Sequence, residues 1–168
     1  MKRELTAFVR EVVLPAGPDK RPRIDHKSCG FALCYRASPI HRWGIFAAEA
    51  IRARRRVIEY TGQRIGLEEA KRRSIRPFLY TFISGKRTLI DGAIGGSGAE
   101  FVNHSCEPNL VARSRSGRIH FVSRRTIAKG EELLIDYQIT CDSPLYPCHC
   151  GSPRCRGFMN RPPAPAEP

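Results

Sequence analysis

The sequence predicts a mainly β domain of small sheets with few short helices. Short segments rich in β-branched or aromatic residues recur between turn signals, which is typical of strands. Only one segment carries a helical pattern, and the contents of 41% hydrophobic and 27% charged residues are those of a globular domain. The expected strands are Arg56–Tyr60, Leu79–Ser84, Thr88–Asp91, Asn109–Arg113, Arg118–Ser123 and Glu132–Asp136.

The helical segment is Leu67–Arg76. Its two consecutive glutamates precede Arg72 and Arg73 by four positions each, the favourable order for ion pairs along a helix, and Pro77 ends it. The sequence SRSG at Ser114–Gly117 lies between two of the expected strands and predicts a hairpin turn.

Composition divides the chain, whose 168 residues suffice for one domain with its own core. Prolines and basic residues at the start predict an extended arm, with a short helix or strand near Leu5–Leu14. The expected parts are a basic arm at residues 1–25, the main domain at 26–140, a cysteine segment at 141–160 and a proline-rich tail at 161–168.

Several protein classes are excluded by the same reading. No run of about 18 apolar residues exists, so a membrane-spanning helix is not expected. The N-terminus lacks the apolar stretch of a secretion signal. Seven cysteines, of which four have metal-like spacing, fit a reducing compartment better than a disulfide framework. We therefore expect an intracellular protein, in a nucleus or in a bacterial cytoplasm or nucleoid.

The net charge of +13, from 29 Lys and Arg against 16 Asp and Glu, favours polyanionic partners. DNA, RNA and an acidic protein surface all qualify, and a soluble basic protein without such a partner is the alternative. The same charge repels a basic peptide at long range unless acidic residues line its groove.

Four cysteines form a candidate zinc site. Cys148, Cys150 and Cys155 follow the pattern C-x-C-x4-C, and Cys106 supplies a fourth thiol from far upstream. Zinc held by these four would tie the C-terminal segment onto the loop that contains Asn103. Four buried thiols without metal are the alternative. The other cysteines, Cys29, Cys34 and Cys141, show no such pattern and are expected to be ordinary thiols.

Three motifs in order resemble a known family. They are NHSC at Asn103–Cys106, ELLIDY at Glu132–Tyr137 and the cysteine pattern at Cys148–Cys155. With them the chain resembles SET-domain protein lysine methyltransferases that carry a post-SET zinc segment, over about residues 36–160. Weaker likeness lies in HRWGIFAAEAI (His41–Ile51), EYTGQRI (Glu59–Ile65) and LYTF (Leu79–Phe82).

The resemblance implies a fold and a reaction. The fold is a set of small curved sheets around a pseudoknot, in which the C-terminal strand passes beneath a preceding loop and brings Asn103 and His104 next to Tyr137. The implied cofactor is S-adenosylmethionine, with the substrate lysine entering from the opposite face. Because a free lysine amine has a pKa of about 10.4, a narrow apolar channel must favour its neutral form. Alignment of the reacting atoms then supplies most of the rate.

Residue roles also follow from the resemblance. Tyr137 is the expected catalytic position, and Tyr80 is expected to line the site beside the cofactor or the lysine. A tyrosine bonded to a backbone carbonyl and a core aromatic are the respective alternatives. The expected cofactor-binding residues are Arg42, Trp43, Gly44, Tyr80, Asn103, His104, Tyr137 and Phe158. Trp43 could instead pack in the core, and Phe158 could pack on the zinc loop.

Four positions depart from the family pattern or vary within it. Arg42 stands where a glycine usually begins the cofactor turn, Ser97 replaces an asparagine, and Glu100 replaces an arginine. The charge reversal at Glu100 changes a local ion pair and bears on cofactor affinity. Ile135, two residues before Tyr137, replaces the usual phenylalanine or tyrosine; being smaller and without a hydroxyl, it predicts a roomy site that makes di- or trimethyl-lysine.

The predicted function is therefore transfer of methyl groups to lysine in a histone or another basic protein, with nucleic-acid contact through the basic surface and no membrane. The alternative is a catalytically weakened SET fold that binds nucleic acid or chromatin. A zinc-ribbon binder is disfavoured because it needs two local cysteine pairs.

Overall fold

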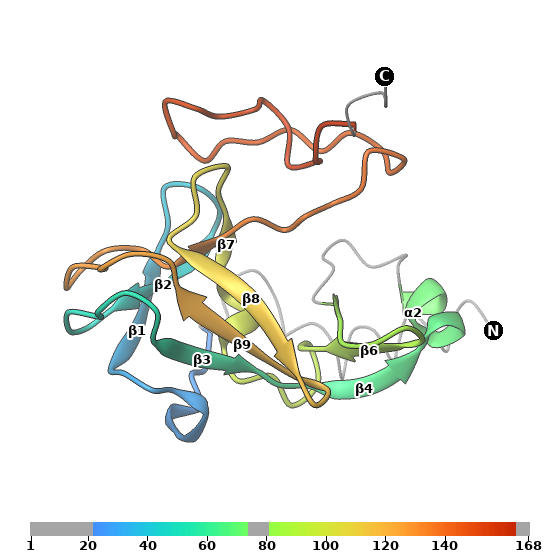
Figure 1. The fold of residues 1–168 in the computed structure, drawn as a ribbon, viewed down its shortest axis with the longest axis horizontal. Helices are drawn as coiled ribbons and strands as arrows, with labels where there is room; N and C mark the ends of the chain where they lie inside the picture. The colour runs from blue at the N-terminus through green and yellow to red at the C-terminus, as the bar shows by residue number, and fades with distance from the viewer. Residues whose placement is uncertain (1–21, 74–80, 164–168) are drawn as a thin grey trace.

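The computed structural model describes residues 22–73 and 81–163 (Figure 1). No helix among these residues has the length and hydropathy needed to cross a membrane. The regular elements are η2 (His26–Ser28), β1 (Leu33–Ala37), β2 (Trp43–Ala47), β3 (Arg56–Tyr60), β4 (Gln63–Gly66), α2 (Leu67–Arg73), β5 (Thr81–Ile83), β6 (Thr88–Asp91), η3 (Ala99–Phe101), β7 (Asn103–His104), β8 (Leu110–Arg115), β9 (Arg118–Ser123) and β10 (Leu134–Ile135).

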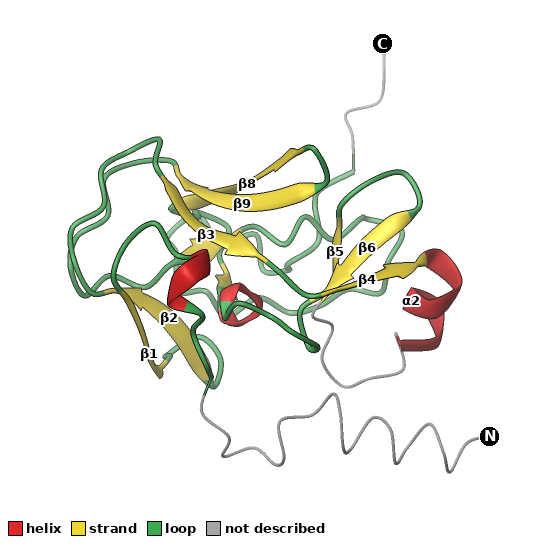
Figure 2. Ribbon diagram, turned by 90° about the horizontal axis from the view of Figure 1, so that it is seen from below, coloured by secondary structure: helices red, strands yellow, loops and turns green. Residues whose placement is uncertain are grey.

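The described strands form four small sheets, as Figure 2 shows, which confirms the mainly β prediction. Two sheets have three strands, in the orders β3-β9-β8 and β4-β6-β5, and every pair in them is antiparallel. The β1–β2 pair is also antiparallel, whereas β7 and β10 run parallel. Both β8 and β5 are therefore edge strands, a position that matters for the site.

Most expected strands are present with small changes of length. The segments predicted for β3, β6 and β9 match the observed bounds. The strand expected at Asn109–Arg113 is observed as β8, and the part of Leu79–Ser84 that the structure describes contains β5. The five-residue strand expected at Glu132–Asp136 is observed in two pieces: Glu132 forms an isolated antiparallel bridge with Phe46, and Leu134–Ile135 form β10, which pairs with the equally short β7. Strands β1, β2 and β4 were not among the predicted segments.

The predicted hairpin turn joins β8 to β9. Arg115 pairs with Arg118, which leaves Ser116 and Gly117 as the two loop residues. Both have positive φ, of 51° and 73°, as a type I′ turn requires. Glycine meets this requirement without strain, which explains how the short sequence signal fixes the register of the hairpin.

Helix α2 begins where the pattern predicts, and residues 74–76 of the predicted segment lie outside the described residues. Glu69 pairs with Arg73 at 2.6 Å, as expected. The prediction that Glu68 pairs with Arg72 is wrong: Glu68 contacts Lys71 at 3.0 Å, one residue closer on the same helix face. The other end of Arg73 donates to the fully buried Asp91 of β6 at 2.7 Å, which fixes the helix against the sheet β4-β6-β5.

The core lies between the two three-stranded sheets and the β1–β2 hairpin. The rings of Tyr60, Phe82 and Phe121 lie 5.3–5.8 Å apart and connect these sheets. Ile24 joins this core, and the backbone N–H of Asp25 donates to the carbonyl of Ser97 at 2.9 Å. The described end of the expected N-terminal arm therefore packs on the domain.

The parallel pair β7–β10 closes the domain. Leu134 lies opposite Asn103 and Ile135 opposite His104. This pairing joins the two most informative sequence motifs and gives the adjacency that the implied pseudoknot requires. From its end, residues 136–163 continue as a segment that crosses above the sheets in Figure 1.

Candidate functional site

A groove of about 1140 Å³ lies between the two edge strands. The β8 residues Leu110 to Arg113 line one side, and the β5 residues Thr81 to Ile83 line the other. Ile135 and Tyr137 contribute from the segment between them. Ile135 is only 3% exposed, whereas Tyr137 is 42% exposed, so the groove has an apolar interior beside an accessible phenol.

Tyr137 is held at three points. Its hydroxyl donates to the carbonyl of Val102 at 3.1 Å, and its ring packs edge-on against His104 with centroids 5.3 Å apart. Its backbone N–H donates to Nδ1 of His104 at 3.1 Å. The hydroxyl thus has the carbonyl partner of an ordinary structural tyrosine, but the side chain faces a groove rather than the core. Its oxygen keeps lone pairs for another donor.

His104 connects Tyr137 to the cysteine cluster. Because Nδ1 accepts from the Tyr137 backbone, the ring proton of the neutral form lies on Nε2, which is 3.6 Å from the sulfur of Cys106. Burial lowers the pKa of His104 below its ordinary value and favours this neutral form. One imidazole therefore contacts Tyr137 on one side and a candidate metal ligand, Cys106, on the other.

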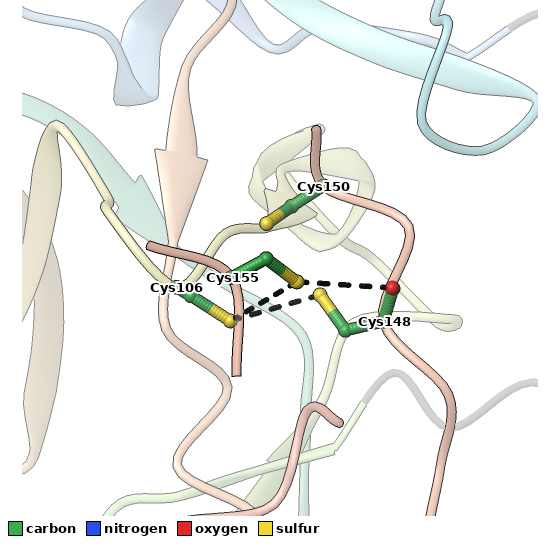
Figure 3. A group of neighbouring side chains, drawn as sticks. All are labelled: Cys106, Cys148, Cys150 and Cys155. Carbon is green, nitrogen blue, oxygen red and sulfur yellow. Dashed lines mark hydrogen bonds between the residues drawn. The ribbon is translucent and has the colours of Figure 1, made fainter. Parts of the chain in front are cut away.

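The four predicted zinc ligands come together. The sulfurs of Cys106, Cys148, Cys150 and Cys155 all lie within 4.8 Å of one another and point inward in Figure 3. The sulfur of Cys106 is 3.7 Å from that of Cys148 and 4.0 Å from that of Cys155. Tetrahedral zinc with bonds of about 2.3 Å requires sulfurs about 3.8 Å apart. The donor set and its spacing therefore fit zinc closely.

The surroundings act on the cluster thiols in opposite directions, because burial raises the pKa of Cys106 and of Cys148 whereas backbone donors approach the sulfurs. The backbone N–H groups of Arg156 and Gly157 donate to the sulfurs of Cys106 and Cys155, each at 3.4 Å. Burial opposes ionisation of Cys150, but hydrogen bonds from the backbones of Cys106 and Ser152 outweigh it and lower the pKa of this thiol to about 6. Such donors stabilise metal-bound sulfur from outside the ligand shell.

An ion pair connects the cysteine segment to the residue before Tyr137. Arg156 donates to both carboxylate oxygens of Asp136, at 2.8 and 3.1 Å, and also to the carbonyl of Met159 at 3.3 Å. Although burial opposes it, Arg156 holds the pKa of Asp136 below its usual range. Within the described part of the chain, Nε of Arg156 is a buried donor without a partner. This bidentate contact fixes the residue before Tyr137 to the cysteine segment.

The expected cofactor turn is held by Asn103 and Glu132. The side-chain nitrogen of Asn103 donates to the carbonyls of His41 and Trp43 at 3.3 and 3.0 Å and to Glu132 at 2.9 Å. A Cβ on Gly44 would lie 2.2 Å from the same Glu132 carboxylate, so a larger residue there would displace the Glu132 side chain from Asn103. The nitrogen of Asn103 is committed to the protein, and its oxygen accepts from no described residue.

The remaining predicted cofactor residues lie around this turn and on the cysteine segment. Arg42 has a φ of 44°, so the backbone departs locally from the usual extended form. The Trp43 ring packs edge-on against Tyr35 at 5.8 Å and is half-buried. Phe158 is 41% exposed, and its carbonyl lies 3.9 Å from the sulfur of Cys106. Tyr80 lies outside the described residues.

Ser97 and Glu100, which depart from the family pattern just before β7, each form hydrogen bonds away from the cysteine cluster. The buried Ser97 donates to the carbonyl of Glu59 at 2.5 Å. Glu100 accepts from the backbone N–H of Gly98 at 2.9 Å, and burial raises the pKa of its carboxyl to about 7. This carboxyl lies near buried Tyr60, whose pKa is raised by burial and by the charge of Glu100.

Three residues that position the candidate site were not predicted from the sequence: Glu132, Asp136 and Arg156. Glu132 and Asp136 belong to the motif ELLIDY, which could have marked them as site residues. Their partners, however, come from distant segments of the chain. Arg156 directly follows the last cysteine, and its bidentate contact with Asp136 could be inferred only from the folded chain.

Comparison with known proteins explains the arrangement. Residues 42–138 of this chain match the sequence model of the protein family described as SET domain. The histone-lysine N-methyltransferases described as H3 lysine-4 specific from Eremothecium gossypii and Saccharomyces cerevisiae are each 38% identical over 73% of this chain. The corresponding protein from Schizosaccharomyces pombe is 35% identical over 94% of the chain. The aligned parts make up only 13–18% of these relatives.

Solved structures agree with this likeness. The crystal structure of an active polycomb repressive complex 2 in the basal state matches 64% of this chain and 15% of its own, with a TM-score of 0.60 and 32% identity. An autoinhibited form of such a complex matches with a TM-score of 0.57 and 30% identity.

The first prediction concerns the metal. Purified protein is expected to hold one zinc ion per chain, and Cys155→Ser is expected to lose most of it because a closed structural site needs all four ligands. Metal analysis after dialysis measures this. Cys141→Ser is the matched control, since Cys141 is exposed and lies outside the cluster. Full zinc content in Cys155→Ser would contradict the assignment.

The second prediction concerns Glu100. Its folded-state pKa of about 7 lies above the ordinary 4.5, so the folded form binds the proton more tightly than the unfolded chain does. The resulting stability is complete below about pH 4.5 and is lost as the pH rises through about 7. Between pH 5 and 8, wild type should lose about 1–3 kcal/mol relative to Glu100→Gln in urea unfolding. The exposed Glu68→Gln is the control, and parallel pH curves for Glu100→Gln and wild type would refute the prediction.

Proposed function

This chain belongs to the SET-domain family, and from that membership we propose that it is a protein lysine N-methyltransferase that uses S-adenosylmethionine. The single observation that supports this most is the position of Tyr137, which stands in a groove with its hydroxyl fixed by Val102 and its ring against His104. Asn103 and the zinc-type cluster surround it from the other side, in the arrangement that the family motifs require.

The groove prepares the lysine amine for the reaction. S-adenosylmethionine supplies an electrophilic methyl group when it is bound. The buried Ile135 offers the amine no polar contact, which disfavours the charged ammonium. Since the Tyr137 hydroxyl donates its proton to Val102, its oxygen can accept an N–H from the neutral amine and orient the nitrogen lone pair. The released proton can leave along the open groove to water, so no strong base is required.

We assign cofactor binding to the turn that Asn103 holds. Its side-chain oxygen has no described donor and suits the ammonium at the amino-acid end of the cofactor. Arg42, Trp43 and Gly44 would offer their backbone there, and Phe158 would cover the adenine from the cysteine segment. Zinc would have a structural role only, because four thiolates leave it no open position.

The proposed substrate is the N-terminal tail of histone H3, at the lysine-4 position for which the relatives are named. The groove suits an extended peptide because its walls, β8 and β5, are edge strands of the described sheets, and an extended peptide can add to such an edge. Its charged lining residues are Arg54, Arg113, Arg124, Arg161 and Asp136. The charges of the groove therefore do not favour binding of a basic tail. We propose that the protein binds the tail on chromatin, in the nucleus, where contact with nucleic acid offsets the repulsion.

A second candidate function is a SET-fold binding module without catalysis. The charge of +13 and the replacement of arginine by Glu100 favour it. A degenerate site would be expected to lose part of the set formed by Asn103, His104 and Tyr137, whereas this chain has all three in contact or in register. Cofactor binding separates the two candidates, because the binding module does not require it.

Tyr137→Phe tests the enzyme directly. Methyl transfer to an H3 peptide from labelled cofactor is expected to fall by about 100-fold, since the variant loses the oxygen that orients the amine. Cofactor binding, measured by calorimetry, should change little. Tyr146→Phe, which alters another exposed tyrosine outside the groove, should keep full activity. Equal activity in both variants would exclude the proposed role of Tyr137.

Product analysis tests the role of Ile135. At exhaustive turnover, mass spectrometry of the peptide should show di- or trimethyl-lysine, because isoleucine leaves room beside the amine and holds no water there. Ile135→Tyr should shift the product toward monomethyl-lysine. Monomethyl-lysine as the only wild-type product would show that this interpretation is wrong.

A further inference from the structure

We propose that an arginine cluster at one end of the groove binds the phosphate backbone of duplex DNA. The cluster consists of Arg52, Arg54 and Arg55 in the turn before β3, together with Arg124 directly after β9. The DNA contact stands on the charges and geometry of these residues alone. Its use in presenting a histone substrate rests on the proposed function.

The backbone of the cluster is rigid. The buried Ser123 accepts from the N–H of Arg54 at 2.8 Å through its carbonyl, and from that of Arg55 at 2.9 Å through its hydroxyl. The same hydroxyl donates to the carbonyl of Arg52 at 2.7 Å. In Figure 1 this turn and the loop after β9 lie side by side, and Ile51 pairs with Ile127 just beyond. Arg124, the next residue after Ser123, therefore lies against the turn. A fixed backbone lowers the entropy lost when a ligand is bound.

The turn contains one left-handed residue, Arg54. Arg54 has a φ of 60°, a left-handed conformation that costs a residue with a Cβ about 1–2 kcal/mol. Glycine would relieve that strain. The turn thus holds an arginine at a position where glycine would be less strained.

The charges of the cluster are not neutralised by the protein. In the described part of the chain, no acidic side chain pairs with Arg52, Arg54, Arg55 or Arg124, although Arg124 donates to the carbonyl of Pro108 at 3.3 Å. The nearby acids are already engaged, since Glu131 pairs with Arg125 and Glu107 with Arg154. The cluster is thus a local excess of guanidinium groups, which match phosphate oxygens in geometry and charge.

The absence of apolar groups favours DNA over an acidic protein. Protein interfaces are centred on buried aromatic or aliphatic side chains. The large exposed hydrophobic residues of the described chain are Leu67, Ile83, Tyr137, Leu145, Tyr146 and Phe158, and none belongs to this turn or to the loop after β9. A surface of arginines alone suits a phosphate backbone, which is read without sequence preference.

The position of the cluster suggests how DNA contact would assist substrate binding. Arg54 and Arg124 line the same groove as Tyr137. DNA on the cluster would therefore lie beside one mouth of the groove. Its negative charge would offset the repulsion between the arginine-lined groove and a basic tail, so a tail that emerges beside DNA enters more readily than a free peptide.

Salt-dependent binding to a short DNA duplex, measured by fluorescence anisotropy without cofactor, tests the contact. Arg54→Gln/Arg55→Gln removes two charges from the cluster. Lys86→Gln/Arg87→Gln removes two exposed charges from the β5–β6 turn and is the matched control. The cluster variant should bind more weakly, and the slope of log K against log salt should become shallower by about 2. The control variant should keep the wild-type slope.

Three outcomes would overturn the proposal. Equal losses in both variants would mean that the charge acts diffusely, and no loss in the cluster variant would mean that DNA binds elsewhere. Loss of binding to a polyglutamate peptide with unchanged DNA binding would point to an acidic protein as the partner. Melting temperatures and circular-dichroism spectra that match those of wild type verify that the cluster variant is folded. An inactive wild type that still binds DNA as expected would refute only the proposed function.

Discussion

The parallel contact between β7 and β10 is the constraint on which the site depends. Two residues on each side place Asn103 and His104 beside the segment that ends in Tyr137. The contact is short, so it needs support from both flanks. Asn103 supplies it on one side through the turn at Trp43, and on the other side the ring of His104 lies between Tyr137 and Cys106. The turn at Trp43, Tyr137 and Cys106 come from different parts of the chain, and the β7–β10 pair brings them together.

The cysteine cluster extends that constraint to the C-terminal segment. Cys106 follows β7 directly, whereas the other three ligands come from beyond residue 145. Arg156 adds a second connection, because it holds Asp136 with its guanidinium and donates to Cys106 with its backbone. Metal ligation and the orientation of Tyr137 are therefore parts of one bonded network.

Much of this arrangement could be predicted from sequence where a signal was local. The cysteine spacing identified three of the ligands, the motif that contains Cys106 supplied the fourth, and β-branched residues between turns located β3, β6 and β9. Glu132 accepts a hydrogen bond from Asn103 and packs against the backbone of Gly44. Neither contact could be predicted, because both residues lie far from Glu132 in the sequence. Strands β1 and β2 were missed for a related reason: Ile45 to Ala47 are all buried, so this part of the chain lacks the alternation that marks a half-exposed strand.

The C-terminal segment has a consequence for how the molecule responds to temperature. Among the described residues after Ile135, only Asn160 is buried, and no apolar side chain there joins the core. The segment is attached by sulfur, charge and hydrogen bonds, whereas the sheets are held by apolar burial. Because apolar burial is the main source of the heat-capacity change on unfolding, release of the segment should involve almost none. The molecule therefore combines a domain that cold weakens with a covering segment whose attachment cold leaves almost unchanged.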